Sequence, residues 1–147
     1  MVSQTGSQTP RPEIRPLRDE DRDGVKDLWA RCGLVVPHND PDADIARARG
    51  RETSDILVAG DHLGAIVASV MVGHDGHRGW IYYVAVDPDR RETGLGRAIV
   101  GAAETWLRAR GVPKAQLMIR ETNTSVRDFY AALGWRESPR LVMERWL

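Results

Sequence analysis

The stretch of sequence that decides the fold runs from residue 82 to residue 106 and reads YYVAVDPDRRETGLGRAIVGAAETW. It opens with aromatic and β-branched residues, which belong to a predicted strand, Trp80–Val86. The segment 87–89 (DPD) ends that strand with turn residues. The residues from Gly94 to Arg110 carry apolar side chains at helical spacing and predict the best-defined helix of the chain. The stretch therefore predicts a strand, a glycine-rich turn and a helix in succession.

Two helices are predicted upstream of this stretch. The first follows Asp19, which can act as its N-cap. Its apolar face has helical spacing and is formed by Val25, Leu28, Trp29 and Cys32. The second starts at Pro41, a residue suited to the first helical turn, and runs to about Arg49. Asn39 or Asp40 would cap it, and its short apolar face places it on the surface.

The remaining segments complete an α+β layout. Further strands are predicted at Ile14–Arg18, Ile56–Ala59, Ala65–Val72 and Ala115–Ile119, and at the C-terminus at Trp135 and Leu141–Trp146. A fourth helix is predicted from about Thr124 to Leu133. Short turns favour an antiparallel meander, whereas the helical crossover makes the next strand parallel. We expect a mixed, mostly antiparallel sheet of about six to seven strands, flanked by about four helices.

The composition is that of a globular protein without a membrane segment. The chain has 147 residues, of which 41% are hydrophobic, and its 21 basic and 21 acidic residues cancel. This balance argues against nucleic-acid binding, and no apolar run approaches the length of a membrane span. Cys32 is the only cysteine, so an internal disulfide is excluded. We interpret residues 1–12 as a flexible tail, residues 13–147 as a single domain, and the protein as cytoplasmic.

The segment 91–97 (RETGLGR) is the strongest functional signal. At a helix start the first N–H groups lack partners and the helix dipole is positive, so anions bind there. Gly94 and Gly96 would let a pyrophosphate approach the main chain, and Arg91 and Arg97 add positive charge. The alternative is that the two glycines only make a tight turn. The dinucleotide-binding motif does not fit, because Ile99 stands where its third glycine belongs, and the P-loop motif is absent.

This loop and the strand before it resemble the acetyl-CoA signature of the GNAT superfamily of N-acetyltransferases. The matching pattern is Arg91-x-x-Gly94-x-Gly96, and the resemblance in element order covers about residues 14–147. It implies that acetyl-CoA is a co-substrate, and that loop residues including Thr93 bind its pyrophosphate. No metal is expected. Glu92 departs from the pattern, since many members carry glycine or a basic residue there, so its carboxylate should point to solvent.

The resemblance also implies how the rest of the cofactor is held. Val84 and Val86 would align the pantetheine arm through main-chain hydrogen bonds. Asn123 would contact the same arm, and Tyr130, in the motif FYAALGW (129–135), would face the sulfur. A phenol with its ordinary pKa of about 10 is protonated at neutral pH and can donate to a departing thiolate. The alternative is that Tyr130 is simply a core residue of its helix.

The acceptor side is less defined. Met118 stands where some ribosomal-protein N-terminal acetyltransferases carry a glutamate, so Glu121 or a relayed water would have to act as base. Tyr82 or Tyr83 could touch the substrate, one from each face of the sheet, because strand side chains alternate.

Asp40 and Asp44 could attract a cationic amine. The alternative is structural, with Asp40 capping a helix and Asp44 on its solvent face. Their segment (37–45) and the turn 75–79 (DGHRG) resemble the bacterial YpeA-type subgroup. The favoured interpretation of Asp75-Gly76 is a hairpin turn, and a metal site there is not favoured.

The sequence thus predicts an N-acetyltransferase that moves an acetyl group from acetyl-CoA to a primary amine of a small molecule, peptide or protein. The alternative is a non-catalytic acyl-CoA-binding module that regulates a partner. Neither a nucleic acid nor a membrane is expected as a partner, and a homodimer is possible because dimers are common in the family.

Overall fold

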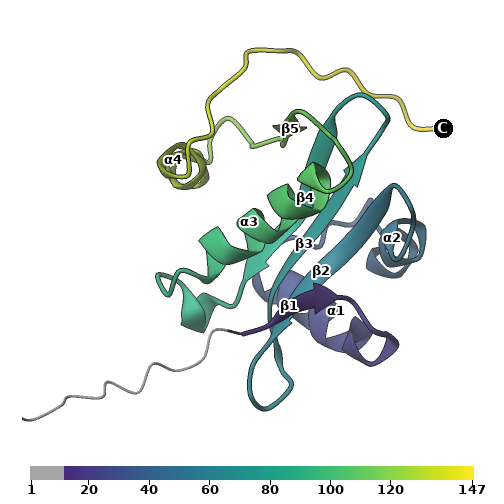
Figure 1. The fold of residues 1–147 in the computed structure, drawn as a ribbon, viewed down its shortest axis with the longest axis vertical. Coiled ribbons are helices and arrows are strands. Elements are labelled where there is room, and N and C mark those ends of the chain that lie inside the picture. The colour runs from purple at the N-terminus through teal and green to yellow at the C-terminus, as the bar shows by residue number, and fades with distance from the viewer. Residues whose placement is uncertain (1–11) are drawn as a thin grey trace, which may run out of the picture. The chain divides into compact units, whose positions relative to one another are not determined.

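The computed structural model describes residues 12–147. Residues 1–11, and with them nearly all of the predicted N-terminal tail, lie outside the described residues. The chain divides into two compact units, Met1–Leu117 and Met118–Leu147. The elements of the first unit are β1 (Ile14–Pro16), the 3₁₀ turn η1 (Asp19–Asp21), α1 (Arg22–Arg31), α2 (Pro41–Ala48), β2 (Ser54–Gly60), β3 (Ile66–His74), β4 (Gly79–Val86), the 3₁₀ turn η2 (Pro88–Arg90), α3 (Leu95–Arg108) and β5 (Ala115–Gln116). The second unit contains α4 (Thr124–Ala132) (Figure 1).

A five-stranded sheet forms the centre of the first unit, with the strands in the order β1-β2-β3-β4-β5. The pairs from β1 to β4 are antiparallel, and β5 runs parallel to β4. The meander and the crossover through α3 confirm the predicted topology. The strand count is lower than the six to seven expected.

The C-terminal strands predicted at Trp135 and Leu141–Trp146 were wrong. Residues 133–147 form no helix or strand, and Leu141 and Met143 are 95% and 92% exposed. A strand exists only where its main chain pairs with a neighbour, and an alternating sequence cannot supply that neighbour. For the same reason β5 ends at Gln116, short of the predicted Ile119.

Helices cover the two faces of this sheet, with α1 and α2 on one face and α3 on the other (Figure 1). The first face holds a buried cluster that includes Trp29, whose indole N–H donates a 2.8 Å hydrogen bond to the hydroxyl of Ser69. On the opposite face α3 lies very close to β4 at Gly79. A Cβ there would be 2.6 Å from a methyl group of Leu107, so only glycine allows this packing. The core therefore lies on both faces of β3 and β4.

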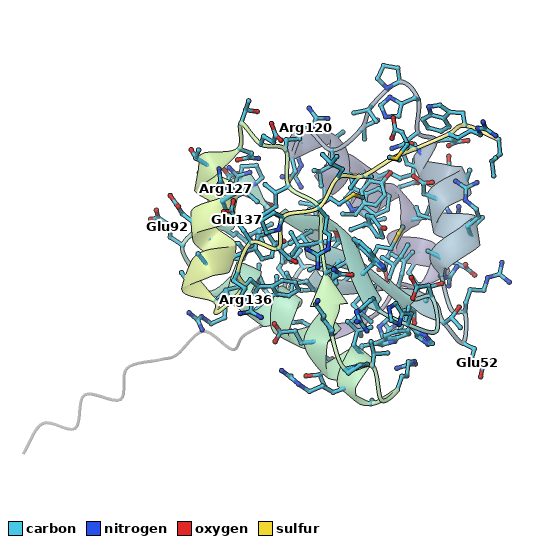
Figure 2. The ribbon with its side chains drawn as sticks, turned by 90° about the horizontal axis from the view of Figure 1, so that it is seen from above. Glu52, Glu92, Arg120, Arg127, Arg136 and Glu137 are labelled. Atoms are coloured by element: carbon cyan, nitrogen blue, oxygen red, sulfur yellow. The ribbon has the colours of Figure 1, made fainter. Side chains whose placement is uncertain are left out.

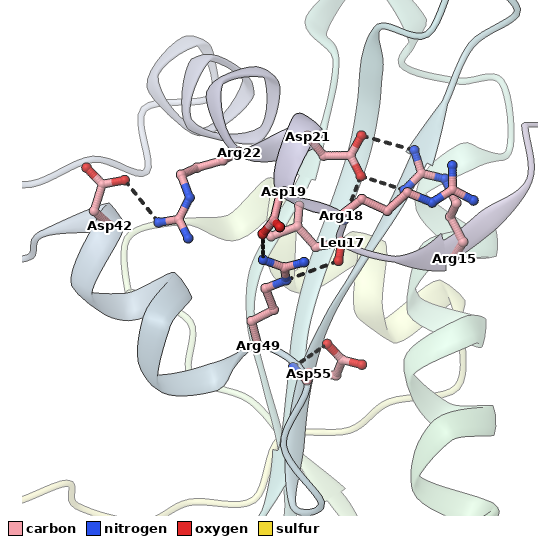
Figure 3. A network of polar contacts seen from close by, with 10 residues as sticks. Arg15, Leu17, Arg18, Asp19, Asp21, Arg22, Asp42, Arg49 and Asp55 are labelled. Atoms are coloured by element: carbon pink, nitrogen blue, oxygen red, sulfur yellow. Dashed lines mark hydrogen bonds and ion pairs between the residues drawn. The ribbon is translucent and has the colours of Figure 1, made fainter.

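A polar network joins β1, η1 and α2 (Figure 3). The buried carboxylate of Asp21 accepts hydrogen bonds of 2.5 and 3.0 Å from Arg15 and one of 2.8 Å from the main chain of Arg18. The hydrogen bond from Arg15 lowers the pKa of Asp21. Asp19, predicted as the cap of α1, instead lies in η1 and pairs with Arg49. The prediction failed because η1 inserts a turn before α1, so Asp21 occupies the cap position.

Candidate functional site

The loop between β4 and α3 enters the helix through two residues with positive φ. Glu92 has φ 68° and Gly94, the N-cap residue of α3, has φ 83°. Gly94 adopts this left-handed conformation without a Cβ penalty. Within residues 12–147, none of the main-chain N–H groups from Arg91 to Arg97 donates a hydrogen bond. The loop therefore presents a row of unengaged donors at the positive end of a 14-residue helix.

The side chains around these N–H groups leave positive charge available. Arg91 and Arg97 are exposed, and in the described part of the chain neither forms an ion pair. Glu92 is also exposed, and its carboxylate points outward in Figure 2. The hydroxyl of Thr93 donates a 2.6 Å hydrogen bond to the carbonyl of Arg90, which closes the turn. This arrangement suits an anion with several oxygen atoms.

Two ion pairs anchor the loop from outside. Arg90 donates a 2.9 Å hydrogen bond to Asp61, in the turn between β2 and β3. Arg31 of α1 pairs with Asp87 at 3.2 Å, and that carboxylate also caps η2. Main-chain hydrogen bonds are the largest cause of the lowered pKa of both Asp61 and Asp87, so both are ionised at neutral pH. These two ion pairs thus join the loop to α1 and to the turn between β2 and β3.

Within the described part of the chain, the edge of β4 next to this loop has no strand partner over most of its length. β5 pairs only with Gly79 and Trp80 at the start of β4. The N–H of Asp87 donates to Val67 on the β3 side, so by alternation the N–H of Val86 points to the open edge. The carbonyl of Val86 accepts a hydrogen bond from the thiol of Cys32 at 3.3 Å. Among the described residues, the N–H of Val86 thus has no strand partner, whereas its carbonyl is already engaged by Cys32.

β4 contains a bulge between Tyr82 and Ala85, where the register with β3 shifts. The bulge places Tyr82 and Tyr83 on the same face, which corrects the prediction of one tyrosine on each face. Tyr82 lies opposite Met71, and Tyr83 stacks on Trp29 of the same face with ring centroids 4.0 Å apart. The prediction failed because alternation holds only in a regular strand. Val84 lies inside this bulge.

The residues predicted to meet the acceptor have different structural roles. Asp40 is the N-cap of α2 and accepts a 3.0 Å hydrogen bond from the main chain of Asp42. Asp44 is not on a solvent face, because its carboxylate accepts hydrogen bonds from Tyr83 at 2.6 Å and from Arg47 at 2.6 Å. Tyr82 is 42% exposed and lines a groove. The Tyr83–Asp44 pair was missed, because no local signal links residues 39 positions apart.

Asn123 and Tyr130 both lie in the second unit. Asn123 is the N-cap of α4, and its side-chain oxygen accepts a 3.4 Å hydrogen bond from Val126. Tyr130 is the buried residue of α4, and it packs edge-on against Phe129 and Trp135. Burial raises the pKa of Tyr130 to about 12. Its hydroxyl is therefore protonated at neutral pH, as a proton donor must be.

Arg127 of α4 forms an ion pair with Glu137, which ties the residues after the helix back to it (Figure 2). Residues 12–147 contain no cluster of three or more His, Cys, Asp or Glu side chains that could hold a metal ion. In the same residues no helix is long and apolar enough to cross a membrane.

Comparisons with known proteins show what the chain is similar to. An acetyltransferase of Pectobacterium atrosepticum, ECA0875, is 46% identical over 123 residues, covering 84% of this chain and 86% of the relative. A Trypanosoma brucei acetyltransferase structure is 28% identical and covers 91% of this chain and 99% of its own, with a TM-score of 0.70.

A structure of the aminoglycoside N-acetyltransferase AAC(6')-Iy with a CoA-containing bisubstrate analogue shares the fold. Its TM-score is 0.79 at 17% identity, with 94% of this chain and 99% of the other covered. The sequence model of the Acetyltransferase (GNAT) family matches residues 22–135, which include the loop, α3 and α4. The chain belongs to the Acetyltransferase (GNAT) family, has its mixed α+β fold, and is an acyltransferase.

Proposed function

We propose that this protein transfers the acetyl group of acetyl-CoA to a primary amine by direct attack within a ternary complex. Two observations on residues 12–147 carry the proposal: the N–H groups from Arg91 to Arg97 donate no hydrogen bond, and most of the adjoining edge of β4 has no strand partner. A diphosphate needs the first feature and a pantetheine amide needs the second. The residues of the loop and strand therefore fit CoA.

The loop residues would hold the diphosphate. Main-chain N–H groups of Gly94 and Gly96 can approach its oxygens closely, and Arg91 and Arg97 would neutralise its charge. Thr93 supports the turn through its bond to Arg90. Val84 and Val86 would pair with the pantetheine arm through their main chain, and the family resemblance assigns Asn123 to the same arm.

The chemistry requires one proton acceptor and one proton donor. Acetyl-CoA, when bound, supplies an activated thioester that an uncharged amine attacks at the carbonyl carbon. Tyr130 would donate its hydroxyl proton to the departing thiolate, since its raised pKa keeps it protonated. Glu121 or a water held at the strand end would accept the proton that the amine loses.

Two structures that share the fold support the acceptor class that we propose. AAC(6')-Iy in the compared structure is an aminoglycoside N-acetyltransferase, and a glucosamine-6-phosphate N-acetyltransferase from Arabidopsis thaliana shares the fold at 22% identity and a TM-score of 0.74, covering 91% of this chain and 97% of its own. Both names describe transfer to an amine. We extend that class to this chain, with Asp40, Asp44 and Tyr82 on the acceptor side.

Further parts of the proposal concern the organisation of the protein. The family model spans residues of both compact units, which supports a single acetyltransferase domain over residues 13–147. We also propose the YpeA-type subgroup, a cytoplasmic location and a homodimer, on the sequence arguments above.

The test begins with acetyl-CoA and the full chain in a thermal-shift titration. Binding to the native state alone stabilises it by about 2.7 kcal/mol at a ligand concentration 100 times the Kd. A free-thiol assay with a broad amine panel then measures turnover. A stability gain with amine-dependent thiol release supports the transferase. A stability gain with only slow hydrolysis favours the non-catalytic acyl-CoA-binding module, and no stability gain removes the cofactor site.

A further inference from the structure

A shallow groove lies on the face of β3 and β4 that α2 borders. Its volume is about 210 Å³, and it is lined mainly by apolar surface from residues that include Ala48, Met71, Trp80 and Tyr82. Sites for drug-sized ligands typically measure about 300–1,000 Å³. The groove is therefore suited to a narrow ligand, such as an aliphatic chain or a single ring.

Two aromatic rings form a shelf in this groove. Trp80 and Tyr82 are two positions apart on β4, so both side chains lie on the same face. Their ring planes are within 18° of parallel, with centroids 6.5 Å apart. Tyr82 is 42% exposed and is not part of the buried cluster that holds Tyr83. Trp80 is half-buried beside it. An organic cation that lies against the face of a tryptophan or tyrosine ring is attracted by the π electrons of that ring.

Negative charge stands at the end of this shelf. Asp75 lines the groove, and its Oδ1 accepts hydrogen bonds of 2.9 Å from the main chain of His77 and 2.8 Å from that of Arg78. These bonds lower the pKa of Asp75, so it is ionised at neutral pH. The pKa of the Tyr82 phenol is raised, mainly by burial and to a smaller extent by the negative charge of Asp75. No lysine or arginine lines the described groove.

The groove runs from Asp75 toward the bulge of β4. From Trp80 to Tyr82, where the bulge begins, is two positions, or roughly 7 Å at about 3.3 Å per residue. An amine that reacts beside the bulge would therefore leave the rest of its molecule over Tyr82 and Trp80.

We propose that this groove binds the acceptor, and that the acceptor is an elongated amine with a second positive charge, held by the rings of Trp80 and Tyr82 and by Asp75. This inference rests on the proposed function for the position of the reacting amine. The groove itself is defined by residues of the first unit alone.

A binding experiment tests the groove without the reaction. The probe is hexyltrimethylammonium, a cation that cannot be acetylated, titrated into the full chain by calorimetry beside the neutral 1-hexanol. Trp80→Leu should weaken binding of the cation by about 2- to 30-fold. Asp75→Asn retains the turn acceptor but removes the charge, and should weaken it by about 2- to 5-fold at low salt and less at high salt. Asp23→Asn removes one exposed charge on α1 and should change nothing.

A turnover experiment separates the two proposals. Linear diamines of increasing length are compared with monoamines of equal length, at saturating acetyl-CoA. The preference for diamines, measured as the ratio of kcat/KM values, should fall in Trp80→Leu and Asp75→Asn, while the KM for acetyl-CoA stays constant. If the cation binds but no amine is turned over, the proposed function is wrong, whereas the proposal that the groove binds a cationic amine still holds. If the cation does not bind and neither substitution changes amine turnover, the proposal that this groove binds the acceptor is wrong.

Discussion

The hydroxyl of Tyr83 donates a 2.6 Å hydrogen bond to Oδ2 of Asp44, and this bond ties the bulge of β4 to α2. The ring of Tyr83 also stacks on Trp29 at 4.0 Å with an interplanar angle of 18°. Both contacts hold a residue whose φ of 50° is unusual for a side chain of this size. The bulge is therefore stabilised by the contacts of Tyr83 with Trp29 of α1 and Asp44 of α2.

The first prediction concerns the hydrogen bond between Tyr83 and Asp44. Tyr83→Phe keeps the stack on Trp29 but removes the donor to Asp44. We expect the free energy of unfolding to fall by about 1.5–3 kcal/mol, the usual contribution of a hydrogen bond to a charged group. Urea denaturation measures it. Asp44→Asn, which retains an acceptor, should cost less, and equal stability of Tyr83→Phe and wild type would contradict the role given to this bond.

The second prediction concerns the main chain of the bulge. The hydroxyl of Ser69 accepts from the buried indole of Trp29 and donates to the carbonyl of Tyr83 at 3.0 Å. Ser69→Ala leaves both partners unsatisfied inside the protein, so we expect a loss of about 2–3 kcal/mol. Ser54→Ala is the matched control, because the hydroxyl of Ser54 makes a single hydrogen bond, to the carbonyl of Ala48. A loss no larger than that of the control would show that the bulge does not depend on Ser69.

Local signals allowed much of the fold to be predicted. The strand, turn and helix over residues 80–110 depend on nearby residues, as does the cap of α2 at Asp40, so the sequence pattern was sufficient. The bulge was not predictable, because it depends on partners from α1, α2 and β3 that meet only in the folded chain. The prediction of C-terminal strands failed for a related reason. The pattern at Leu141–Trp146 is typical of a strand, but it does not tell whether a neighbouring strand is there to pair with it.

The same division applies to the candidate site. The turn at Gly94 was predicted from the sequence, whereas the ion pairs that anchor it, Arg90–Asp61 and Arg31–Asp87, join segments far apart in sequence. The groove beside Trp80 was missed because Tyr82 was considered alone, without the ring two positions before it. Long-range contacts therefore decide how a locally predictable loop is held.

The third prediction concerns acid stability. The Arg15 hydrogen bond lowers the pKa of buried Asp21 in the folded protein. A lowered folded pKa stabilises the protein above the unfolded value of about 3.9, and this contribution is lost as the pH falls through the folded value. Asp21→Asn should therefore cost about 1.5–3 kcal/mol at pH 7. The difference between variant and wild type should narrow below about pH 4, as followed by urea denaturation at each pH, and a constant difference would contradict the assignment.

The fourth prediction concerns the charges beside the loop. Arg91→Gln and Arg97→Gln should each raise the KM for acetyl-CoA, by roughly 10-fold at low salt if each side chain contacts a phosphate. The effect should shrink as salt screens the charges. Arg108→Gln is the control, since Arg108 is exposed at the far end of the same helix. Steady-state kinetics measure all three variants, and an equal effect of Arg108→Gln would indicate net charge instead of local contact.

The fifth prediction concerns the proton donor. Tyr130→Phe should keep the affinity for acetyl-CoA but lose about 10²–10⁴ in kcat, the usual contribution of one acid–base group. Since burial raises the pKa of Tyr130 to about 12, ionisation of its hydroxyl should not lower kcat at any pH below about 11. Phenylalanine fills the same packing position between Phe129 and Trp135, so the melting temperature is expected to change little and reports on the fold. Unchanged turnover with an intact fold would make Tyr130 a core residue only, because a group that packs but transfers no proton can lose its hydroxyl without loss of rate.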